Sequence, residues 1–257
     1  MENQTISVSV IAQNEVDRIG RLLKSVAFAD EIIVVDSGST DGTQEFCKQN
    51  GAKVLFSEWK GYAAQKQLAM EHATSEWILN MDADEEISDA LAVEIRSAIN
   101  NPALNVCAFS MNRLSRYLGR WIKHGGWYPD RKVRLVRKGK GVWHGDTLHE
   151  KLVVDGVIER LSKPILHHVY RKISDQLNTI DRFSDLHATK HGPTSGWYVL
   201  AGVFHALGKF IECYLWKLGL LDGIAGLVIA MNSSWYVFLK HAKAWELHLH
   251  EKDCTGN

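Results

Sequence analysis

A short apolar run that ends in a group of carboxylates constrains the fold of this chain more than any other feature. The run covers residues 77–81, is too brief for a helix and has polar residues on both sides, which predicts a buried strand. Asp82 and Asp84 follow it directly. Ligands bind at the carboxyl ends of strands in an open α/β sheet, and two nearby carboxylates favour a divalent cation, so we interpret this pair as a candidate metal and diphosphate site. The alternative is a solvated loop before a helix, where acidic residues suit the helix dipole.

Segments typical of strands and helices alternate through the first part of the chain. Strands are predicted at 5–12, 31–35, 53–56 and 77–81, with helices at 15–27, after residue 43 and at 62–73. This alternation is typical of a parallel sheet with right-handed crossovers, so we predict an α/β fold with Rossmann-like architecture. No Gly-x-Gly-x-x-Gly turn follows the first strand, which argues against a nicotinamide or flavin cofactor.

The second part of the chain contains further strands around a long segment rich in arginine and aromatic residues. We predict a helix at 88–99 and strands at 106–111, 132–136 and 151–154. Residues 113–131 lie between two of these strands. Aromatic faces suit sugar rings and arginines suit phosphate, so we interpret the segment as a functional loop. The alternative is a surface hairpin with structural tryptophans.

The last third of the sequence is predicted to be helical and is strongly apolar. A polar helix at 174–191 precedes two apolar segments at 197–218 and 222–247. The first segment contains too many charges for a bilayer span, and the uncharged part of the second, 223–239, is slightly short for one. Their many aromatic residues predict a helical hairpin that lies on a membrane surface or forms a dimer seam. A buried helical subdomain is the alternative.

Composition narrows the class of protein. With 257 residues and 46% hydrophobic content, the chain can form one large α/β domain with an appendage. Its 30 basic and 30 acidic residues cancel, so we do not expect a nucleic-acid partner. The four cysteines form no Cys-x-x-Cys pair and the N-terminus lacks a signal-peptide pattern, so we expect free thiols in a reducing cytoplasm.

Three motifs, in this order and spacing, resemble the nucleotide-binding half of the inverting family-2 glycosyltransferases, which have the GT-A fold. They are SVSVIAQNE at 7–15, IIVVDSGSTDGT at 32–43 and WILNMDADE at 77–85. Together with GWYPDRKVRL at 126–135, the His149-Glu150 pair and the aromatic tail, nearly the whole chain resembles lipopolysaccharide inner-core β-1,4-glucosyltransferases of the WaaE type.

The resemblance implies a domain organisation. A GT-A domain, with a Rossmann-like and mostly parallel sheet flanked by helices, is expected over 1–172. Its nucleotide-binding half would cover 1–86 and its acceptor half 87–172. A helical C-terminal extension at 173–257 would serve membrane association or dimerisation.

The resemblance also implies roles for individual residues. Asn14 and Glu15 would lie beside the nucleotide, Asp36 would contact the uracil or ribose, Lys66 the base or diphosphate, and Asp82 the ribose or the metal ion. Asp84 would be the principal metal ligand, and Mg²⁺ or Mn²⁺ the cofactor. A C-terminal histidine often binds this metal in GT-A enzymes, and either His167 or His168 matches, although a histidine on an apolar strand is more often structural.

Inverting transfer requires one base that takes a proton from the acceptor hydroxyl and a Lewis acid that stabilises the departing diphosphate. By resemblance the base is a later acidic residue, for which Glu150 is the best match. Asp130 and Asp146 remain alternatives. No Gly-x-Ser-x-Gly or Cys–His motif indicates a covalent nucleophile.

The implied partners are a UDP-sugar donor, with UDP-glucose the first candidate, and a lipid-anchored acceptor. By resemblance the acceptor is a heptose of the lipopolysaccharide inner core, and the enzyme works at the cytoplasmic face of the inner membrane. A second copy of the chain, in a homo-oligomer, is a further candidate partner. A polyprenyl phosphate or another surface glycan would require the same anchoring. A degenerate GT-A scaffold is the non-enzyme alternative.

An EF-hand that begins at Asp82 does not fit, because Ile87 and Val93 stand at its sixth and twelfth positions, where glycine and glutamate are required. No P-loop motif is present either.

Overall fold

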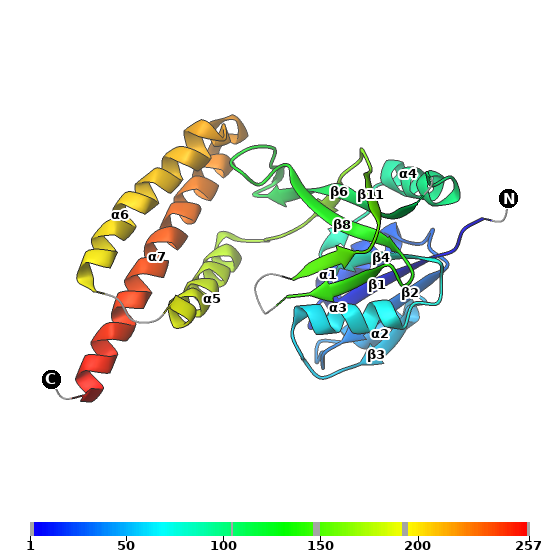
Figure 1. Ribbon diagram of the computed structural model, residues 1–257, viewed down its shortest axis with the longest axis horizontal. Helices are drawn as coiled ribbons and strands as arrows, with labels where there is room; N and C mark the ends of the chain where they lie inside the picture. Colours follow the sequence, from blue (N-terminus) through cyan, green and yellow to red (C-terminus); the bar gives the residue numbers. More distant parts are fainter. Residues whose placement is uncertain (1–2, 104, 146–149, 192–194, 256–257) are drawn as a thin grey trace. The chain divides into compact units, whose positions relative to one another are not determined.

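The chain forms two compact units in the computed structural model, which describes residues 3–103, 105–145, 150–191 and 195–255 (Figure 1). Unit 1 comprises Met1–Arg113 and Asp130–His167. Unit 2 comprises Leu114–Pro129 and His168–Asn257. The two units are therefore not consecutive in sequence, because residues 114–129 group with the C-terminal helices.

Unit 1 is built on a sheet whose first half is parallel. Strands β3, β2, β1 and β4 lie side by side in that order, and they cover Lys53–Phe56, Glu31–Asp36, Ile6–Ala12 and Trp77–Asp82. In the register of this sheet, Ala12 is paired with Asp36 and Ile11 with Asp82. The carboxyl ends of β1, β2 and β4 therefore meet at one edge, which brings three of the predicted motifs together.

The second half of the sheet contains antiparallel pairs. Strand β8 (Asp130–Arg137) pairs with β4 and with β6 (Val106–Tyr117), and both pairings are antiparallel. Strand β11 (Val157–Arg160) pairs with β6, while β12 (Ile165–His167) pairs with the short β5 (Glu85–Glu86). A separate hairpin is formed by β9 (Gly141–His144) and β10 (Lys151–Val154).

Both faces of the sheet carry apolar side chains, so each face is covered by other elements. On one face, α1 (Val16–Ser25), α2 (Thr43–Gln49) and α4 (Asp89–Asn100) contribute to a core that includes strand residues Val8 and Leu79. On the other, α3 (Tyr62–Glu71) and the β9–β10 hairpin pack around Ile33 and Ile78. Neighbouring residues of β4, Ile78 and Leu79, thus enter different cores, as the two-residue period of a strand requires.

In unit 2, long helices carry a largely exposed apolar surface. Helix α5 covers Ile173–His191, α6 covers Gly196–Ile211 and α7 covers Gly223–Thr255, and α7 packs against both of the others. By length and composition alone, two helical stretches, Gly196–Trp216 and Gly219–His250, are long and apolar enough to cross a membrane, whereas the sequence pattern indicated too many charges in the first and too short an uncharged part in the second. Core helices of soluble proteins meet the same criterion. Only 17% and 28% of their most apolar windows are buried, so the described residues leave most of this surface uncovered.

A tight backbone connection joins α6 to α7. A π-helical turn, Glu212–Trp216, is followed by a 3₁₀ turn, Gly219–Asp222, and Leu218 between them has φ of 55°. A Cβ atom added to Gly226 would lie 1.8 Å from the carbonyl oxygen of Gly219, and one added to Gly219 would lie 2.6 Å from that of Cys213. Backbone segments are therefore in direct contact in the connection from α6 to α7, where only glycine fits.

Residues 114–129 form a structured element of unit 2. Strand β6 continues to Tyr117 and forms a hairpin with β7 (Arg120–Trp121), whereas the sequence pattern predicted that this strand would end at Met111. The ring of Tyr117 lies 5.5 Å from that of Trp127, and both contribute to a core that includes Ile229 of α7. The arginines of this strand mask its alternation, which explains why its end was mispredicted.

The predicted fold class is confirmed. The structure is an α/β sheet of the GT-A kind with parallel strands in its nucleotide-binding half, followed by the predicted C-terminal helices. The short strands β5, β7, β9 and β11 were not predicted. The described cysteines Cys47, Cys107 and Cys213 are free thiols.

Candidate active site

The loop after β2 is organised by the carboxylate of Asp36. This side chain is fully buried and accepts hydrogen bonds from the backbone N–H groups of Gly38 and Ser39, at 3.0 and 2.8 Å, and from Gln44 Nε2 at 2.7 Å. The hydroxyl of Ser39 donates to it as well. Gly38 has φ of 89°, a conformation that glycine adopts without strain. Asp36 thus fixes the loop at the strand edge where the sequence predicted a nucleotide.

Asn14 and Glu15 attach the loop after β1 to the same segment. The Oδ1 atom of Asn14 accepts a hydrogen bond of 2.9 Å from the Thr40 N–H, and the N–H of Glu15 donates to Thr43 Oγ1 at 2.9 Å. Within the described ranges, the buried hydroxyl of Ser37 has no hydrogen-bond partner. Asn14, Glu15 and Asp36 therefore contribute to one pair of joined loops, and Ser37 adds a polar group that the sequence analysis did not single out.

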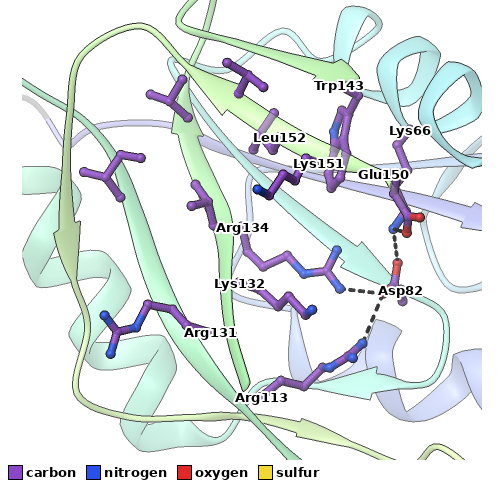
Figure 2. A pocket seen from close by; sticks show the side chains of 14 residues that line it. Lys66, Asp82, Arg113, Arg131, Lys132, Arg134, Trp143, Glu150, Lys151 and Leu152 are labelled. Carbon is purple, nitrogen blue, oxygen red and sulfur yellow. Dashed lines mark hydrogen bonds and ion pairs between the residues drawn. The ribbon is translucent and has the colours of Figure 1, made fainter. Parts of the chain in front are cut away.

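Lys66, Asp82 and Glu150 meet at the end of β4 (Figure 2). The Lys66 ammonium lies 2.8 Å from Asp82 Oδ1 and 3.1 Å from Glu150 Oε1, so one cation joins two carboxylates. It also lies 4.9 Å from the centre of the Trp143 ring, a cation–π distance. Three residues predicted from separate parts of the sequence are thus in direct contact. Asp146 and His149, which were also named in the sequence analysis, lie outside the described residues.

Two residues that the sequence pattern did not single out, Arg134 and Glu85, complete this cluster. The Arg134 side chain is buried on β8 and its Nη2 lies 2.5 Å from Asp82 Oδ2 and 2.7 Å from Glu85 Oε1. Glu85 is 1% exposed, and its other oxygen accepts a hydrogen bond from the Asp82 N–H. The available signal was Arg134 itself, which stands between Val133 and Leu135 in the apolar part of β8, since a charge at such a position must find a partner.

The cations control the ionisation of Asp82. Burial alone would raise the pKa of this carboxyl, but the nearby Arg134 and Lys66 outweigh burial and hold the pKa well below its usual value of 3.8. The same contacts raise the pKa of Arg134. Asp82 is therefore an anion at any physiological pH. Each of its oxygens has a second lone pair, so a further ligand can still approach.

Asp84 and His167 form a second pair beside this cluster. His167 Nε2 lies 3.4 Å from Asp84 Oδ2, because the pairing of β12 with β5 sets His167 opposite Glu85. His168, the alternative from the sequence, belongs to unit 2, where its ring lies 5.6 Å from that of Trp121. Among the residues that the structure describes, no three His, Cys, Asp or Glu side chains are grouped so as to hold a metal ion by themselves.

A cavity of about 810 Å³ opens beside Lys66, Asp82 and Glu150 (Figure 2). Six basic side chains line it, together with Trp143 and an apolar wall. The basic residues are Lys66, Arg113, Arg131, Lys132, Arg134 and Lys151, and the apolar wall consists of Val133, Leu152, Val153, Val154 and Ile158. A cavity of this composition suits an anionic ligand that also has apolar surface, such as a phosphorylated sugar.

Asp130, one alternative to Glu150, lies near this cavity but is held by two cations. Its Oδ2 is 2.9 Å from Arg113 and its Oδ1 is 3.0 Å from Lys132. Burial would raise the pKa of Asp130, but Arg113 and Lys132 outweigh burial and lower the pKa below 3.8. A carboxylate with a lowered pKa is a weaker base, which disfavours Asp130 for proton abstraction.

Comparisons with known proteins identify relatives over most of the chain. Residues 7–161 match the family described as Glycosyl transferase family 2. The chain is 29% identical to the lipopolysaccharide core biosynthesis glycosyltransferase LpsC of Rhizobium meliloti (strain 1021), over 95% of this chain and 93% of that protein. It is 30% identical to the uncharacterized glycosyltransferase RT0209 of Rickettsia typhi (strain ATCC VR-144 / Wilmington), over 98% of this chain and 90% of that protein. The crystal structure of mannosyl-3-phosphoglycerate synthase from Rubrobacter xylanophilus aligns with a TM-score of 0.38 and 21% identity, over 44% of this chain and 40% of that chain.

Replacing Arg134 by Met should destabilise unit 1 and change how its stability depends on pH. Breaking a buried ion pair on one side costs about 3–5 kcal/mol. In the wild type the lowered pKa of Asp82 contributes stability that is present above its unfolded value of 3.8 and is lost as pH falls toward the folded pKa. With Arg134 removed, the pKa of Asp82 rises toward the unfolded value, so less stability remains to be lost in acid. The free energy of unfolding, measured by urea denaturation across about pH 3–7, should therefore fall less steeply toward acid pH in the variant than in the wild type.

The matched control is Arg131→Met on the same strand, whose side chain is exposed and makes no ion pair in the described part of the chain. It should change the free energy of unfolding by less than about 0.5 kcal/mol. If the free energy of unfolding of the Arg134 variant falls toward acid pH as steeply as that of the wild type, Arg134 does not lower the pKa of Asp82.

Proposed function

Since the chain belongs to glycosyltransferase family 2, we propose that it transfers glucose from UDP-glucose, with inversion, to a lipid-anchored glycan. The observation that carries this proposal is the contact of Lys66 with both Asp82 and Glu150 beside a cavity lined by cations. A nucleotide-sugar diphosphate needs positive charge, and an acceptor hydroxyl needs a base. Both requirements are met within this one cluster of unit 1.

The nucleotide would lie on the joined loops after β1 and β2. Asn14 is exposed there, Glu15 is half-buried and Asp36 holds the loop in one conformation. In this proposal Asn14, Glu15 and Asp36 contact the uridine, while Lys66 and Asp82 contact the ribose and diphosphate. The pre-formed hydrogen bonds reduce the entropy that must be lost when the nucleotide binds.

Asp84 and His167 suit a divalent cation that also binds the diphosphate. Two ligands about 2.1 Å from one ion and at a right angle are about 3 Å apart, close to the 3.4 Å between Asp84 Oδ2 and His167 Nε2. Mg²⁺ and Mn²⁺ accept few protein ligands and complete their shells with phosphate and water oxygens. Asp82 is a third candidate ligand. A cation there would neutralise the charge that develops on the departing diphosphate.

Glu150 is the proposed base. It would take the proton of the acceptor hydroxyl while that oxygen forms its bond to the anomeric carbon and the bond from this carbon to UDP breaks. A single displacement of this kind inverts the configuration. Glu150 is favoured over Asp130 because it has one cationic partner among the described residues rather than two, and because it lines the cavity.

The acceptor is proposed to be a heptose of the lipopolysaccharide inner core. The support is the similarity to a lipopolysaccharide core glycosyltransferase over 95% of the chain. The exposed aromatic surface of unit 2 supports an acceptor held in a membrane, which would place the enzyme at the cytoplasmic face of the inner membrane. Labelled UDP-glucose incubated with core-truncated lipopolysaccharide, and separately with polyprenyl phosphate, tests this assignment. Label found only in the polyprenyl product would overturn it.

Donor binding should require a divalent cation. UDP-glucose should bind with Mg²⁺ or Mn²⁺ present and bind much more weakly after chelation, as measured by calorimetry. Asp84→Ala should remove turnover and the metal dependence of binding while changing stability by less than about 1 kcal/mol, because the side chain is partly exposed. The control is Asp155→Ala, whose side chain is 93% exposed. Equal affinity for UDP-glucose with and without chelator would contradict the metal site.

Removing the proposed base should affect turnover but not donor binding. Glu150→Gln keeps the size of the side chain and loses the proton acceptor, so kcat should fall by roughly 10²–10⁴. The affinity for UDP-glucose should stay within about threefold. Glu159→Gln, on the exposed strand β11, is the matched control and should retain full activity. Near-normal turnover of the Glu150 variant would assign the proton transfer to another acid.

The exposed apolar surface of unit 2 should bind lipid. Trp197, Phe204, Trp216 and Ile224 are 79%, 66%, 85% and 79% exposed, a density of apolar groups that is unfavourable in water. The protein should co-sediment with anionic liposomes, and Phe204→Ser combined with Trp216→Ser should weaken this binding about tenfold or more. Phe56→Ser is a matched control, because Phe56 is also 66% exposed but belongs to unit 1. A wild-type protein that ignores liposomes and runs as a monomer without detergent would contradict both the membrane surface and the alternative dimer seam.

A further inference from the structure

Among the described residues around the cavity of unit 1, the charges are balanced except for two cations. Four carboxylates and four cations form one connected network of ion pairs. The carboxylates are Asp82, Glu85, Asp130 and Glu150, and the cations are Lys66, Arg113, Lys132 and Arg134. Within the network, therefore, each positive charge is matched by a negative one.

Arg131 and Lys151 are the two cations that the network leaves over. Both line the same cavity, and in the described part of the chain neither makes an ion pair or a side-chain hydrogen bond. In Figure 2 they reach the cavity from different elements, Arg131 from the strand that carries Lys132 and Lys151 from the strand that carries Leu152. Exposed lysines and arginines often only solvate a surface. These two, however, stand over a concave site with an apolar wall, where a low-dielectric boundary strengthens their field.

We propose that the acceptor carries an anionic substituent, a phosphate or a carboxylate, and that Arg131 and Lys151 bind it next to the hydroxyl that receives the sugar. This rests on the proposed function, since Glu150 marks where that hydroxyl must lie. Lys151 and Glu150 line the same cavity, so an anion bound by Lys151 shares that cavity with the base. Two surplus positive charges match the double negative charge of a phosphate monoester.

The cavity has room for an acceptor beside the donor sugar. The cavity measures about 810 Å³, within the usual range for ligand sites and larger than one sugar ring requires. The donor diphosphate has its own cationic and metal-binding partners at Lys66, Asp84 and His167. The apolar wall formed by Leu152, Val154 and their neighbours would contact the C–H face of a sugar ring.

Acceptor kinetics test the proposal. In assays with UDP-glucose and core-truncated lipopolysaccharide, Arg131→Gln and Lys151→Gln should each raise the KM for the acceptor about tenfold, since a hydrogen bond to a charged group is lost. The KM for UDP-glucose should not change. Lys48→Gln, an exposed residue of α2, is the control. Removing the phosphates of the acceptor, or reducing its carboxylates, identifies the anion: the treatment that raises the wild-type KM should also abolish the difference between wild type and variants.

A binding experiment separates failure of this proposal from failure of the proposed function. With UDP and Mg²⁺ bound, inorganic phosphate should shift the NMR signals of residues around Arg131 and Lys151, and the double variant should lose this response while keeping its affinity for UDP. If the protein does not bind UDP at all, the proposed function fails. If UDP binds but phosphate produces no shift, or if the two variants raise the KM for UDP-glucose instead of that for the acceptor, the anionic acceptor is overturned.

Discussion

The candidate site is organised around one half-buried carboxylate whose negative charge must be compensated. Asp82 ends the central strand β4, and its charge is held by Lys66 from α3 and by Arg134 from β8. A charge removed from water without partners would cost several kcal/mol, so these contacts can form only when helix, strand and sheet register are all correct. Glu85 and Glu150 then share the same two cations. Charge balance therefore makes the geometry of the site depend on the folding of the whole of unit 1.

The buried side-chain amide of Asn80 helps to hold this arrangement. Asn80, two residues before Asp82 on β4, accepts hydrogen bonds of 3.0 Å from Ser9 Oγ and from Trp143 Nε1, and it donates one of 3.1 Å to the carbonyl oxygen of Arg134. It thereby ties β1, β8 and β9 to the strand that carries the carboxylates. The Trp143 ring held in this way is the one that lies under the Lys66 ammonium. A buried polar group with several hydrogen-bond partners fixes one arrangement of its neighbours, which a purely apolar residue at position 80 would not do.

Local sequence patterns predicted the elements whose structure depends on residues close together in the sequence. The parallel strands, their helices and the carboxylates after β4 follow from periodicity and from the edge at which such strands end. The contact of Arg134 with Asp82, by contrast, depends on the antiparallel pairing of β8 with β4, for which the sequence holds no local signal. Likewise, the choice between His167 and His168 as the neighbour of Asp84 is decided by the one-residue register of β12 against β5. The grouping of residues 114–129 with the C-terminal helices is equally a tertiary effect, because their apolar side chains pack against α7.

The glycine contacts in the connection from α6 to α7 limit how this part of the chain can change. Because no side chain fits at Gly219 or Gly226 without moving backbone, this connection does not tolerate substitution at either position. The exposed faces of the two helices keep a fixed spacing at this connection. Sequence drift on the apolar surface is thus free to alter its composition, while the turn that joins its two helices depends on two residues that carry no side chain.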